Sequence, residues 1–571
     1  MLNQVELLDL LLNNRGILPS EKEYFLNPSY DNHIYDPYLL RDMEKSCNRI
    51  YDAIKNQEKI VVYTDYDCDG IPAGVIMHDF FTKIGYENFS IYIPDRHDEG
   101  YGLHLDAIED FIKNDVKLLI TFDLGITAVD EVVFAQNAGM DVIITDHHLP
   151  QDEIPKAFAI INPKLEFDTK HNRNPDKMPA RLDDPSRSGG LCGAGIAFKL
   201  VCGMLKTYPN EWNIQKGWEK WLLDMAGLAT LADQVPLVNE NRVLAYYGLK
   251  VLQKSRRPGL VELFRKAGVD ITKLNEEDVT FTLAPRLNAA SRMGSPRQAF
   301  EVLSTTDSVE ARTVADYLSK INNERKSNVA LIMKEVKHTL NKREEKSIIV
   351  IGNPSWRVGV LGLVASKVAE EYKRSVFVWG SEGSDTIRGS CRGWGSVNLV
   401  SLMSSLPEHS LLSFGGHKSA GGFSVSHEEV HFLEERLISV FDTVDSLQES
   451  QEQEIDATIT LDDITKENYS VIEKLAPYGI GNPKPSFLFE KITVHEIKEF
   501  GKEKNHLEII FLNSKNRPVK AIAFFKTRNS FCTGVGLTEG MKINLTANFE
   551  KSTFAGRTEL RLRIIDVSIA V

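Results

Sequence analysis

The sequence predicts an α/β protein in which a parallel-sheet domain and a second, smaller α/β domain are joined by a long helix and followed by a small β-barrel. Three observations predict this class. Short β-branched segments alternate with helical segments over residues 59–162, and the alternation resumes at Ser347. After Ile455 the chain consists mostly of short strand-like segments. A chain of 571 residues has room for about three to five domains.

The composition is that of a globular protein, with 42% hydrophobic and 26% charged residues. The longest apolar runs are short, and none approaches the ~20 residues that a membrane helix needs. We therefore expect no membrane partner. The six cysteines form no CxxC pair, so neither a zinc site nor a disulfide framework is predicted, and a reducing, cytoplasmic location fits.

The charge is unevenly distributed along the chain. The formal net charge is −13, yet residues 491–571 contain 14 Lys and Arg against 8 Asp and Glu. This leaves a balance of +6 at the end of the chain and −19 elsewhere. An acidic body with a basic C-terminal part suggests that the two parts have different partners.

In chain order, residues 1–55 are predicted to be helical around a loop, and the first α/β unit follows. Its expected strands are Lys59–Thr64, Phe89–Pro94, Lys117–Phe122, Asp141–Thr145 and Phe158–Asn162. Its expected helices are Ala73–Ile84, Leu105–Lys113 and Ala128–Ala138. Residues 165–190 are polar and rich in Asp, Arg and Pro, which predicts a long surface loop.

Helices are expected from Cys192 to about residue 340, with Val309–Leu340 as one long helix or two in series. The second α/β pattern runs from Ser347 to about residue 440, and an acidic, Gln- and Ser-rich linker follows at 441–456. The predicted division is a first domain at 1–255, a helical connector at 256–345, a second α/β domain at 346–442 and a β-domain at 455–571.

Acidic residues follow three strands of the first unit. The first strand leads into Asp65-Tyr66-Asp67-Cys68-Asp69, the third into Asp123 and the fourth into Asp146-His147-His148. In an open parallel sheet, ligands bind just outside the carboxyl ends of the strands. We therefore expect these carboxylates and both imidazoles to converge on one crevice.

Such crowding indicates a cation site. Several carboxylates within ~4–6 Å stay ionised together only when cations neutralise them. Oxygen ligands with one or two imidazoles suit manganese or magnesium better than structural zinc. A set of this size suits two ions ~3.5–4 Å apart, which can clamp the attacking and leaving oxygens of a phosphoryl transfer.

Other interpretations of these residues fit less well. A single Asp after a strand is usually a helix N-cap, but three such strand ends with two adjacent histidines fit that explanation poorly. Dinucleotide binding is disfavoured, because three acids stand where a glycine-rich phosphate turn is needed. Asp233, inside an apolar helix-like run, either makes structural hydrogen bonds or completes the metal shell.

Several motifs resemble a known family. DYDCDG (65–70), Asp123, DHH (146–148) and LADQVPL (231–237) resemble the four motifs of the DHH phosphoesterase superfamily. Four further segments resemble its RecJ family of bacterial single-strand-specific exonucleases: LCGAGIAFKL (191–200), PRLNAASRMG (285–294), SFGGHKSAGGF (413–423) and APYGIGNPKPSF (476–487). The resemblance implies a DHH domain, a DHH-associated domain and a C-terminal OB-like barrel.

The resemblance also implies roles for individual residues. The matched metal ligands are Asp67, Asp69, Asp123, His147 and Asp233. Asp65 and Asp146 lie beside them and either ligate metal or orient ligands. His148 matches the residue that meets the scissile phosphate, and Arg292 matches a phosphate-facing arginine.

Two further groups are implied to bind substrate. Arg96, Ser390 and Arg392 resemble a pocket for a terminal 5′ phosphate, and Gly415, Gly416 and His417 form a stretch that lets backbone approach a nucleotide. The barrel is implied to bind single strands, with bases stacked on aromatic side chains among basic ones. The candidate aromatics are Phe500, Phe511, Phe524, Phe525, Phe531 and Phe554, although most of them could instead form the barrel core.

The implied activity is metal-dependent 5′-to-3′ hydrolysis of single-stranded DNA to 5′ mononucleotides, in DNA repair and recombination. Two Mn²⁺ or Mg²⁺ ions are expected, with a single-strand-binding protein and a helicase as partners of a monomeric enzyme. One alternative is a DHH-type hydrolase of short oligonucleotides, cyclic dinucleotides or pyrophosphate. Another is a non-catalytic replisome relative that only binds DNA or protein, against which the intact acids argue.

Overall fold

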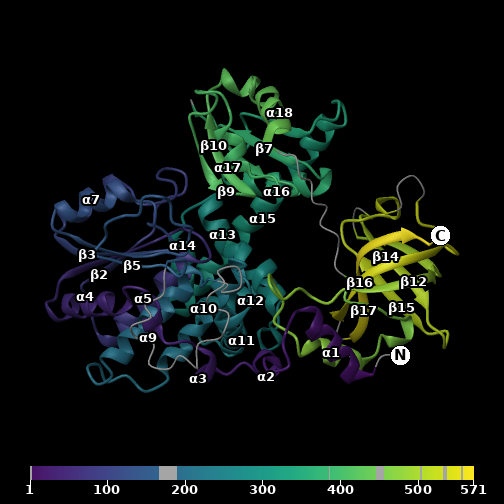
Figure 1. Ribbon diagram of the computed structural model, residues 1–571, viewed down its shortest axis with the longest axis horizontal. Coiled ribbons are helices and arrows are strands. Elements are labelled where there is room, and N and C mark those ends of the chain that lie inside the picture. The colour runs from purple at the N-terminus through teal and green to yellow at the C-terminus, as the bar shows by residue number, and fades with distance from the viewer. Residues whose placement is uncertain are drawn as a thin grey trace.

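The computed structural model describes residues 3–165, 190–384, 386–444, 455–501, 504–531, 536–554 and 557–570. Three sheets form three lobes, with the long helix α15 (Ser308–Leu340) between the first lobe and the second (Figure 1). The predicted loop at 165–190 and most of the predicted linker at 441–456 fall outside the described residues.

The first sheet has five parallel strands in the order β2-β1-β3-β4-β5. The strands are β1 (Lys59–Thr64), β2 (Phe89–Tyr92), β3 (Val116–Phe122), β4 (Asp141–Thr145) and β5 (Ala159–Ile161). Both faces are covered, because alternate strand residues such as Val62 and Val61 belong to different buried clusters. This explains why the strands are almost continuously apolar in the sequence.

Helices pack on both faces of this sheet. The flanking helices are α4 (Met43–Lys55), α5 (Gly70–Ile84), α6 (Leu105–Lys113), α7 (Val129–Asn137) and α9 (Gly193–Thr207). Outside them, α10 (Leu223–Ala232) packs on α5 and α9, and α11 (Asn239–Leu252) packs on α10. Three helices at the start of the chain precede them: α1 (Gln4–Asn14), α2 (Lys22–Leu26) and α3 (Tyr30–His33). The predicted strands and helices of this unit are confirmed to within about three residues.

The connector is helical, as predicted. It comprises α12 (Pro258–Ala267), the π-helix η6 (Asp278–Leu283), α13 (Ala284–Met293), α14 (Arg297–Ser304) and α15. Of the two possibilities left open by the sequence, the structure has the single helix, which runs for 33 residues. The N-terminal half of α15 packs on α12, α13 and α14, whereas Val329, Ile332 and Val336 pack into the second domain.

The second domain is a mixed sheet in the order β6-β7-β8-β10-β9. Its elements are β6 (Ile348–Gly352), α16 (Leu361–Tyr372), β7 (Ser375–Gly380), β8 (Ile387–Arg392), α17 (Leu399–Ser404), β9 (Ser413–His417), β10 (Ala420–Val425) and α18 (Leu433–Val444). Only β6 and β7 are parallel, and β8, β10 and β9 pair antiparallel. The exposed edge strand β9 is the one that carries His417.

The C-terminal lobe is a curved sheet in the order β11-β12-β16-β17-β15-β14-β13. Its elements are β11 (Ala457–Thr458), α19 (Lys466–Glu473), β12 (Phe487–Thr493), β13 (Glu496–Phe500), β14 (His506–Leu512), β15 (Pro518–Ala523), β16 (Lys542–Phe554) and β17 (Arg557–Ile569). The expectation of short strands is wrong for β16 and β17, which have 13 residues each and pair along their length.

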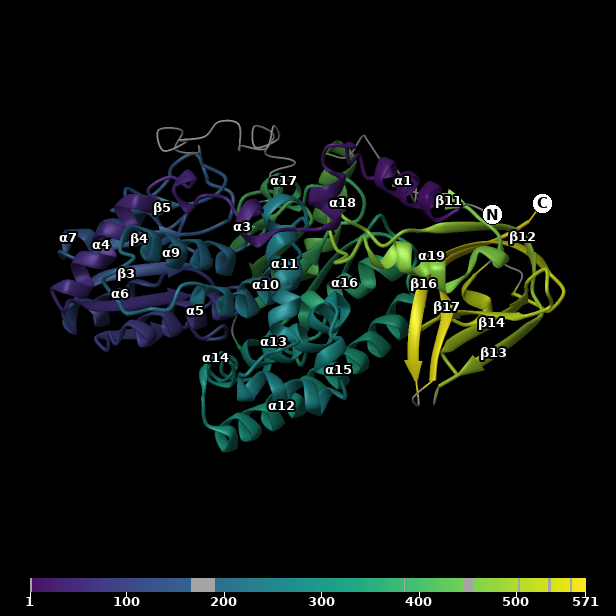
Figure 2. The same cartoon turned by 90° about the horizontal axis from the view of Figure 1, so that it is seen from below.

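The first helix lies against the last domain. Leu7, Leu11 and Leu12 of α1 belong to the same buried cluster as the core of the C-terminal sheet. Both views place α1 beside the β-rich lobe, far from the sheet that follows it in sequence (Figures 1 and 2). In the described part of the chain, no helix is long and apolar enough to cross a lipid bilayer.

The predicted aromatic set of the barrel divides into two groups. Phe511 and Phe531 are buried in the core, so they cannot stack on bases. Phe525 is 78% exposed and Phe500 is 37% exposed, and Phe524 is half-buried with Arg563 over its ring at 4.2 Å. The side chain of Phe554 lies outside the described residues.

Candidate active site

The acids at the strand ends form a row because the sheet ladder continues one residue beyond each strand. Asp65 N donates to Phe122 O at 3.2 Å, Asp123 N to Thr145 O at 3.0 Å, and Asp146 N to Ile161 O at 3.1 Å. These bonds fix Asp65, Asp123 and Asp146 side by side at the carboxyl edge. The convergence predicted from the sequence is therefore confirmed.

Asp69 is fixed from the opposite side by the N-terminus of α9. Its Oδ2 accepts from Gly193 N at 2.6 Å and its Oδ1 from Ala194 N at 2.7 Å. The backbone approaches so closely that a Cβ on Gly193 would lie 2.7 Å from the Cβ of Asp123. A side chain at position 193 would therefore clash with Asp123, so this residue must be glycine.

His147 lies at the centre of the acids. Its Nε2 is 2.9 Å from Asp123 Oδ1, 3.7 Å from Asp69 Oδ2 and 3.8 Å from Asp233 Oδ2. Asp69, His147 and Asp233 form one group of donor atoms within 4.8 Å of one another, and Asp65, Asp67 and Asp123 form a second. A third group, Asp123, His147 and His148, shares a residue with each of them. The first two groups have no residue in common, so the side chains offer two neighbouring three-donor sites.

The electrostatics of this cluster require cations. Burial, followed by the neighbouring carboxylates, raises the pKa of Asp65 and Asp123 well above the usual value and that of Asp233 to about 9. Among the described residues, neither Asp65 Oδ1 nor Asp123 Oδ1 accepts a hydrogen bond, although both are buried and His147 Nε2 lies 2.9 Å from Asp123 Oδ1. Buried carboxylate oxygens that accept no hydrogen bond fit divalent ions with a preference for oxygen.

His148 projects from this row toward the second domain. Its Nδ1 is 2.8 Å from Asp146 Oδ1 and 3.2 Å from the Tyr101 hydroxyl. Its ring stacks on that of His417 from β9, with centroids 5.7 Å apart and planes at 11°. The two domains therefore meet at this histidine pair.

Asp146 is surrounded by donors. Its Oδ2 accepts from Ile126 N at 2.9 Å, and its Oδ1 accepts from the backbone of His147 at 2.7 Å and of His148 at 3.1 Å. Burial opposes ionisation of Asp146, but these bonds and the His148 ring lower its pKa. These contacts indicate that Asp146 orients the ring of His148.

An arginine cluster lies beside the acids. Arg292 has its pKa lowered to about 9 by burial and by the neighbouring positive charges of Arg96, Arg325 and Arg392. Its NH1 donates to Gly359 O at 3.2 Å. Arg96 lies over the Tyr66 ring at 4.9 Å, and Arg392 donates from Nε to Ser366 Oγ at 3.1 Å. A cluster of arginines that repel one another is suited to binding an anion.

Ser390 and the glycines complete the set predicted from the sequence. Ser390 Oγ and Arg392 NH2 both face Gly362, where a Cβ would lie 3.5 and 3.2 Å from them. Gly415 and Gly416 precede His417 on β9, and Gly416 has a φ of 141° with Ala420 O directly beside it. The structure therefore places the predicted site residues where the two α/β domains meet.

Three residues of the candidate active site were not predicted from the sequence. Tyr101 touches both His148 and Asp123 O, the latter at 3.2 Å. Lys164 donates from Nζ to His147 O, and its charge faces Asp146, Asp233 and Asp123. Arg325 reaches the arginine cluster from α15. Only tertiary structure joins these residues to the motifs, although Tyr101 lies in the same PDRHDEGYG segment as Arg96.

Comparison with known proteins gives three matching family models, in chain order. The DHH family N-terminal domain matches residues 59–230, the DHHA1 domain residues 344–447 and the RecJ OB domain residues 455–566. The single-stranded-DNA-specific exonuclease RecJ of Bacillus subtilis is 33% identical over 563 residues, which cover 98% of this chain and 67% of that protein.

Solved structures share the fold. The crystal structure of RecJ in complex with Mn²⁺ from Thermus thermophilus superposes with a TM-score of 0.79 at 23% identity, covering 99% of this chain and 76% of that one. The crystal structure of an exonuclease RecJ bound to manganese has a TM-score of 0.59 at 27% identity and covers 70% and 94%. With its three domain matches in order and a relative that aligns over nearly its whole length, the chain belongs to the RecJ family of DHH exonucleases.

Proposed function

We propose that this chain is an exonuclease that uses two Mn²⁺ or Mg²⁺ ions to hydrolyse single-stranded DNA from its 5′ end to 5′ mononucleotides. The observation that carries the proposal is the pair of three-donor groups at the carboxyl edge of the first sheet, beside a cluster of arginines. The acids can bind metal ions and the arginines can bind phosphate. Two such sets of side chains lying together suit phosphodiester hydrolysis.

The ions would be held by Asp69, His147 and Asp233 in one group and by Asp65, Asp67 and Asp123 in the other. When bound, two such ions supply Lewis acidity and lower the pKa of a water to make it a nucleophile. The set suits both metals, because each prefers oxygen donors and accepts an imidazole.

The surrounding side chains position the substrate. His148, oriented by Asp146 and Tyr101, is placed to donate a hydrogen bond to the scissile phosphate, and His417 closes the cleft from the other domain. Arg292 faces the same phosphate. Arg96, Ser390 and Arg392 would hold the terminal 5′ phosphate, which sets the direction of digestion.

The proposed working units are residues 1–255, 256–345, 346–442 and 455–571. The cleft between the first and third units would admit one strand, and the last unit would bind the strand further along through Phe500, Phe524 and Phe525 among its basic residues. A monomer suffices for this arrangement. A cytoplasmic location is supported by the five free cysteines of the described chain. A single-strand-binding protein and a helicase are the proposed partners, since both expose or occupy single strands.

The test is digestion of single-stranded oligonucleotides labelled at the 5′ or the 3′ end, with Mn²⁺ or Mg²⁺. We expect labelled mononucleotide at once from the 5′ label, no release from a duplex and no release in EDTA. First release from the 3′ label would refute the polarity and the 5′-phosphate pocket. Faster hydrolysis of dinucleotides than of long strands would favour the short-oligonucleotide alternative.

A further inference from the structure

Arg242 is among the largest fully buried side chains of the described residues and has no role in the active site described above. It lies on α11 and is 1% exposed. Its guanidinium donates to four backbone carbonyls, namely Phe25 O at 2.9 Å, Pro477 O at 3.3 Å, Leu475 O at 3.0 Å and Ala476 O at 2.9 Å. The same group lies over the Phe25 ring at 3.8 Å. A side chain of the first domain thus ends inside the C-terminal lobe.

The carbonyls that receive Arg242 are shaped by a second buried side chain. Asn482 is 0% exposed, and its Nδ2 donates to Leu475 O and Pro477 O, both at 2.8 Å. Its Oδ1 in turn accepts from Arg15 Nε at 3.0 Å. We call Arg242, Asn482 and the carbonyls of 475–477 the clasp. The APYGIGNPKPSF motif supplies the barrel side of this clasp.

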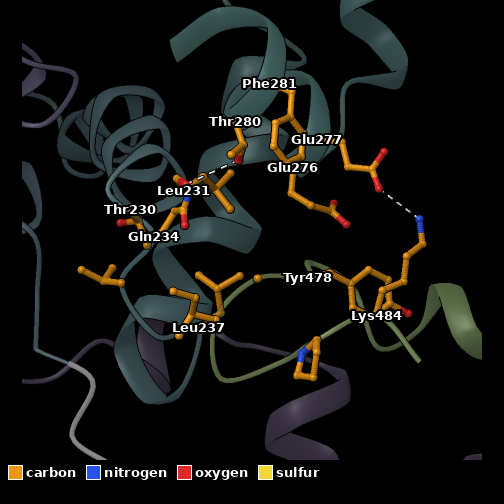
Figure 3. Close-up of a pocket in the computed structure, with 14 residues that line it drawn as sticks. Thr230, Leu231, Gln234, Leu237, Glu276, Glu277, Thr280, Phe281, Tyr478 and Lys484 are labelled. Carbon is orange, nitrogen blue, oxygen red and sulfur yellow. Dashed lines mark hydrogen bonds and ion pairs between the residues drawn. The ribbon is translucent and has the colours of Figure 1, made fainter. Parts of the chain in front are cut away.

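The same loop rests on the chain that follows Asp233. Leu237 N donates to Ile480 O at 2.7 Å, and a Cβ on Gly479 would lie 2.9 Å from Leu237 Cδ1. Nearby, Lys484 pairs with Glu277 at 3.1 Å, as Figure 3 shows. The lobe therefore meets both the first domain and the connector through the segment 475–484.

Apolar packing between the lobes is incomplete. The core of the first domain and the core of the barrel are separate buried clusters. A cavity of about 310 Å³ lies in the seam, lined by Leu231 and Leu237 on one side, Phe281 on another and Tyr478 on the third (Figure 3). Because part of the seam is open space, directional hydrogen bonds can add to shape in fixing the orientation of the lobes.

From these observations we infer that Arg242 is a positioning residue that fixes the barrel against the catalytic domain, so that one DNA strand can occupy both at once. The inference rests on the proposed function. Arg242 and Asn482 are buried and cannot touch DNA, so any effect of changing them on the substrate passes through the orientation of the barrel. The affinity for a strand too short to reach the barrel does not depend on the clasp. The affinity for a long strand does, because that strand binds both the active site and the barrel.

The experiment compares Arg242→Met and Asn482→Ala with the unaltered protein on two 5′-phosphorylated substrates. One is a tetranucleotide, and the other is a single strand of about 25 nucleotides, which spans the cleft and an OB-fold site. We expect kcat/KM on the long strand to fall about tenfold through KM, with the tetranucleotide changed by less than about twofold. Small-angle scattering of the DNA-free variants is expected to show a larger radius of gyration.

Arg49→Met is the matched control. Arg49 is also a largely buried arginine of the first domain, but it pairs with Glu58 at 2.7 Å and Asp141 at 2.6 Å at the opposite edge of the sheet. The Arg49→Met variant should leave the ratio of the two kcat/KM values and the radius of gyration unchanged. If Arg242→Met does not fold, Asn482→Ala carries the test from the other side of the clasp.

Two outcomes would overturn the inference. An equal fall on both substrates would mean that the clasp acts on the catalytic centre, and unchanged scattering with an unchanged long-strand rate would mean that packing alone orients the barrel. Failure of the proposed function is distinguishable, because the unaltered protein would then hydrolyse neither substrate or would prefer the tetranucleotide to the long strand, while the scattering comparison still reports on the clasp.

Discussion

Asp69 is a metal-ligand candidate whose carboxylate is held by backbone hydrogen bonds. Both oxygens accept backbone hydrogen bonds from the first residues of α9, and the side chain is buried. Hydrogen bonds to the ionised form oppose the cost of burying the charge. The position of the α9 backbone therefore decides where this ligand stands relative to His147.

Replacing Gly193 should disturb this arrangement directly. In Gly193→Ala the new Cβ would meet the Cβ of Asp123 at 2.7 Å and Asp69 Oδ2 at 3.1 Å. We expect Mn²⁺ affinity, measured by isothermal titration, to fall about 10–100-fold, as for lost ligand support in other metal sites. Gly195→Ala, where the nearest atom would be Leu191 Cβ at 3.3 Å, serves as the control. Equal affinities in the two variants would contradict the steric argument.

Asp123→Asn should raise the stability of the metal-free protein and lower its activity. Burial and four neighbouring acids raise the pKa of Asp123, so its ionised form destabilises the metal-free fold. In chelator we expect the free energy of unfolding to rise by about 1 kcal/mol, as when other strained functional groups are removed. Hydrolysis of single strands should fall at least about 100-fold. An active variant, or one less stable than the unaltered protein in chelator, would refute this assignment. Asp52→Asn, at an exposed position of α4, is the control.

At the level of elements, two helices behind the site cross unusually closely. Gly227 of α10 and Gly248 of α11 face each other, and a Cβ on either would lie 2.5 Å from the Cα of the other. Contact at this distance places α10, and with it Asp233 at its C-terminal end, against α11, which carries Arg242. The crossing thus connects a metal-binding acid with the clasp.

Gly248→Ala should force the two helices apart. Overpacking of this kind costs about 1–3 kcal/mol, which denaturant unfolding would detect as a lower midpoint with an unchanged slope. Ser401→Ala, on the exposed face of α17, should be nearly neutral. A neutral Gly248→Ala would show that the helices can separate without cost.

The sequence predicted some elements much better than others. Parallel strands buried on both faces are continuous β-branched runs, so β1 and β4 were predicted at their observed limits. The length of β16 and β17 depends on their mutual pairing, which local pattern does not record. The strand-end acids were predictable because the sheet geometry aligns them, whereas Tyr101, Lys164 and Arg325 reach the cleft only through tertiary packing.

At the scale of the whole molecule, repulsion between the buried acids of the metal site affects the stability of the metal-free protein. Burial raises the pKa of Asp69 to about 6, with Asp67 adding to the effect. In the metal-free protein, protonation of Asp69 therefore contributes stability below pH ~4, and this contribution is lost as the pH rises through about 6. Bound cations would replace the protons at neutral pH.

Removing metal should accordingly destabilise the protein, and more so at higher pH. At a free Mn²⁺ concentration 100 times the dissociation constant, one ion adds about 2.7 kcal/mol to the free energy of unfolding. We expect a thermal shift on Mn²⁺ addition that is larger at pH 7.5 than at pH 5.5, relative to chelator. The Asp123→Asn variant should show a smaller shift, and an equal shift in both proteins would locate the stabilising ion elsewhere.

The position of α1 has a consequence for synthesis. Its leucines complete the core of a lobe whose strands leave the ribosome several hundred residues after this helix. The apolar face of this helix must therefore remain uncovered while several hundred residues are added behind it. During that interval the nascent chain presents a hydrophobic surface to the cell, which predicts a need for a chaperone that recognises short amphipathic helices early in translation.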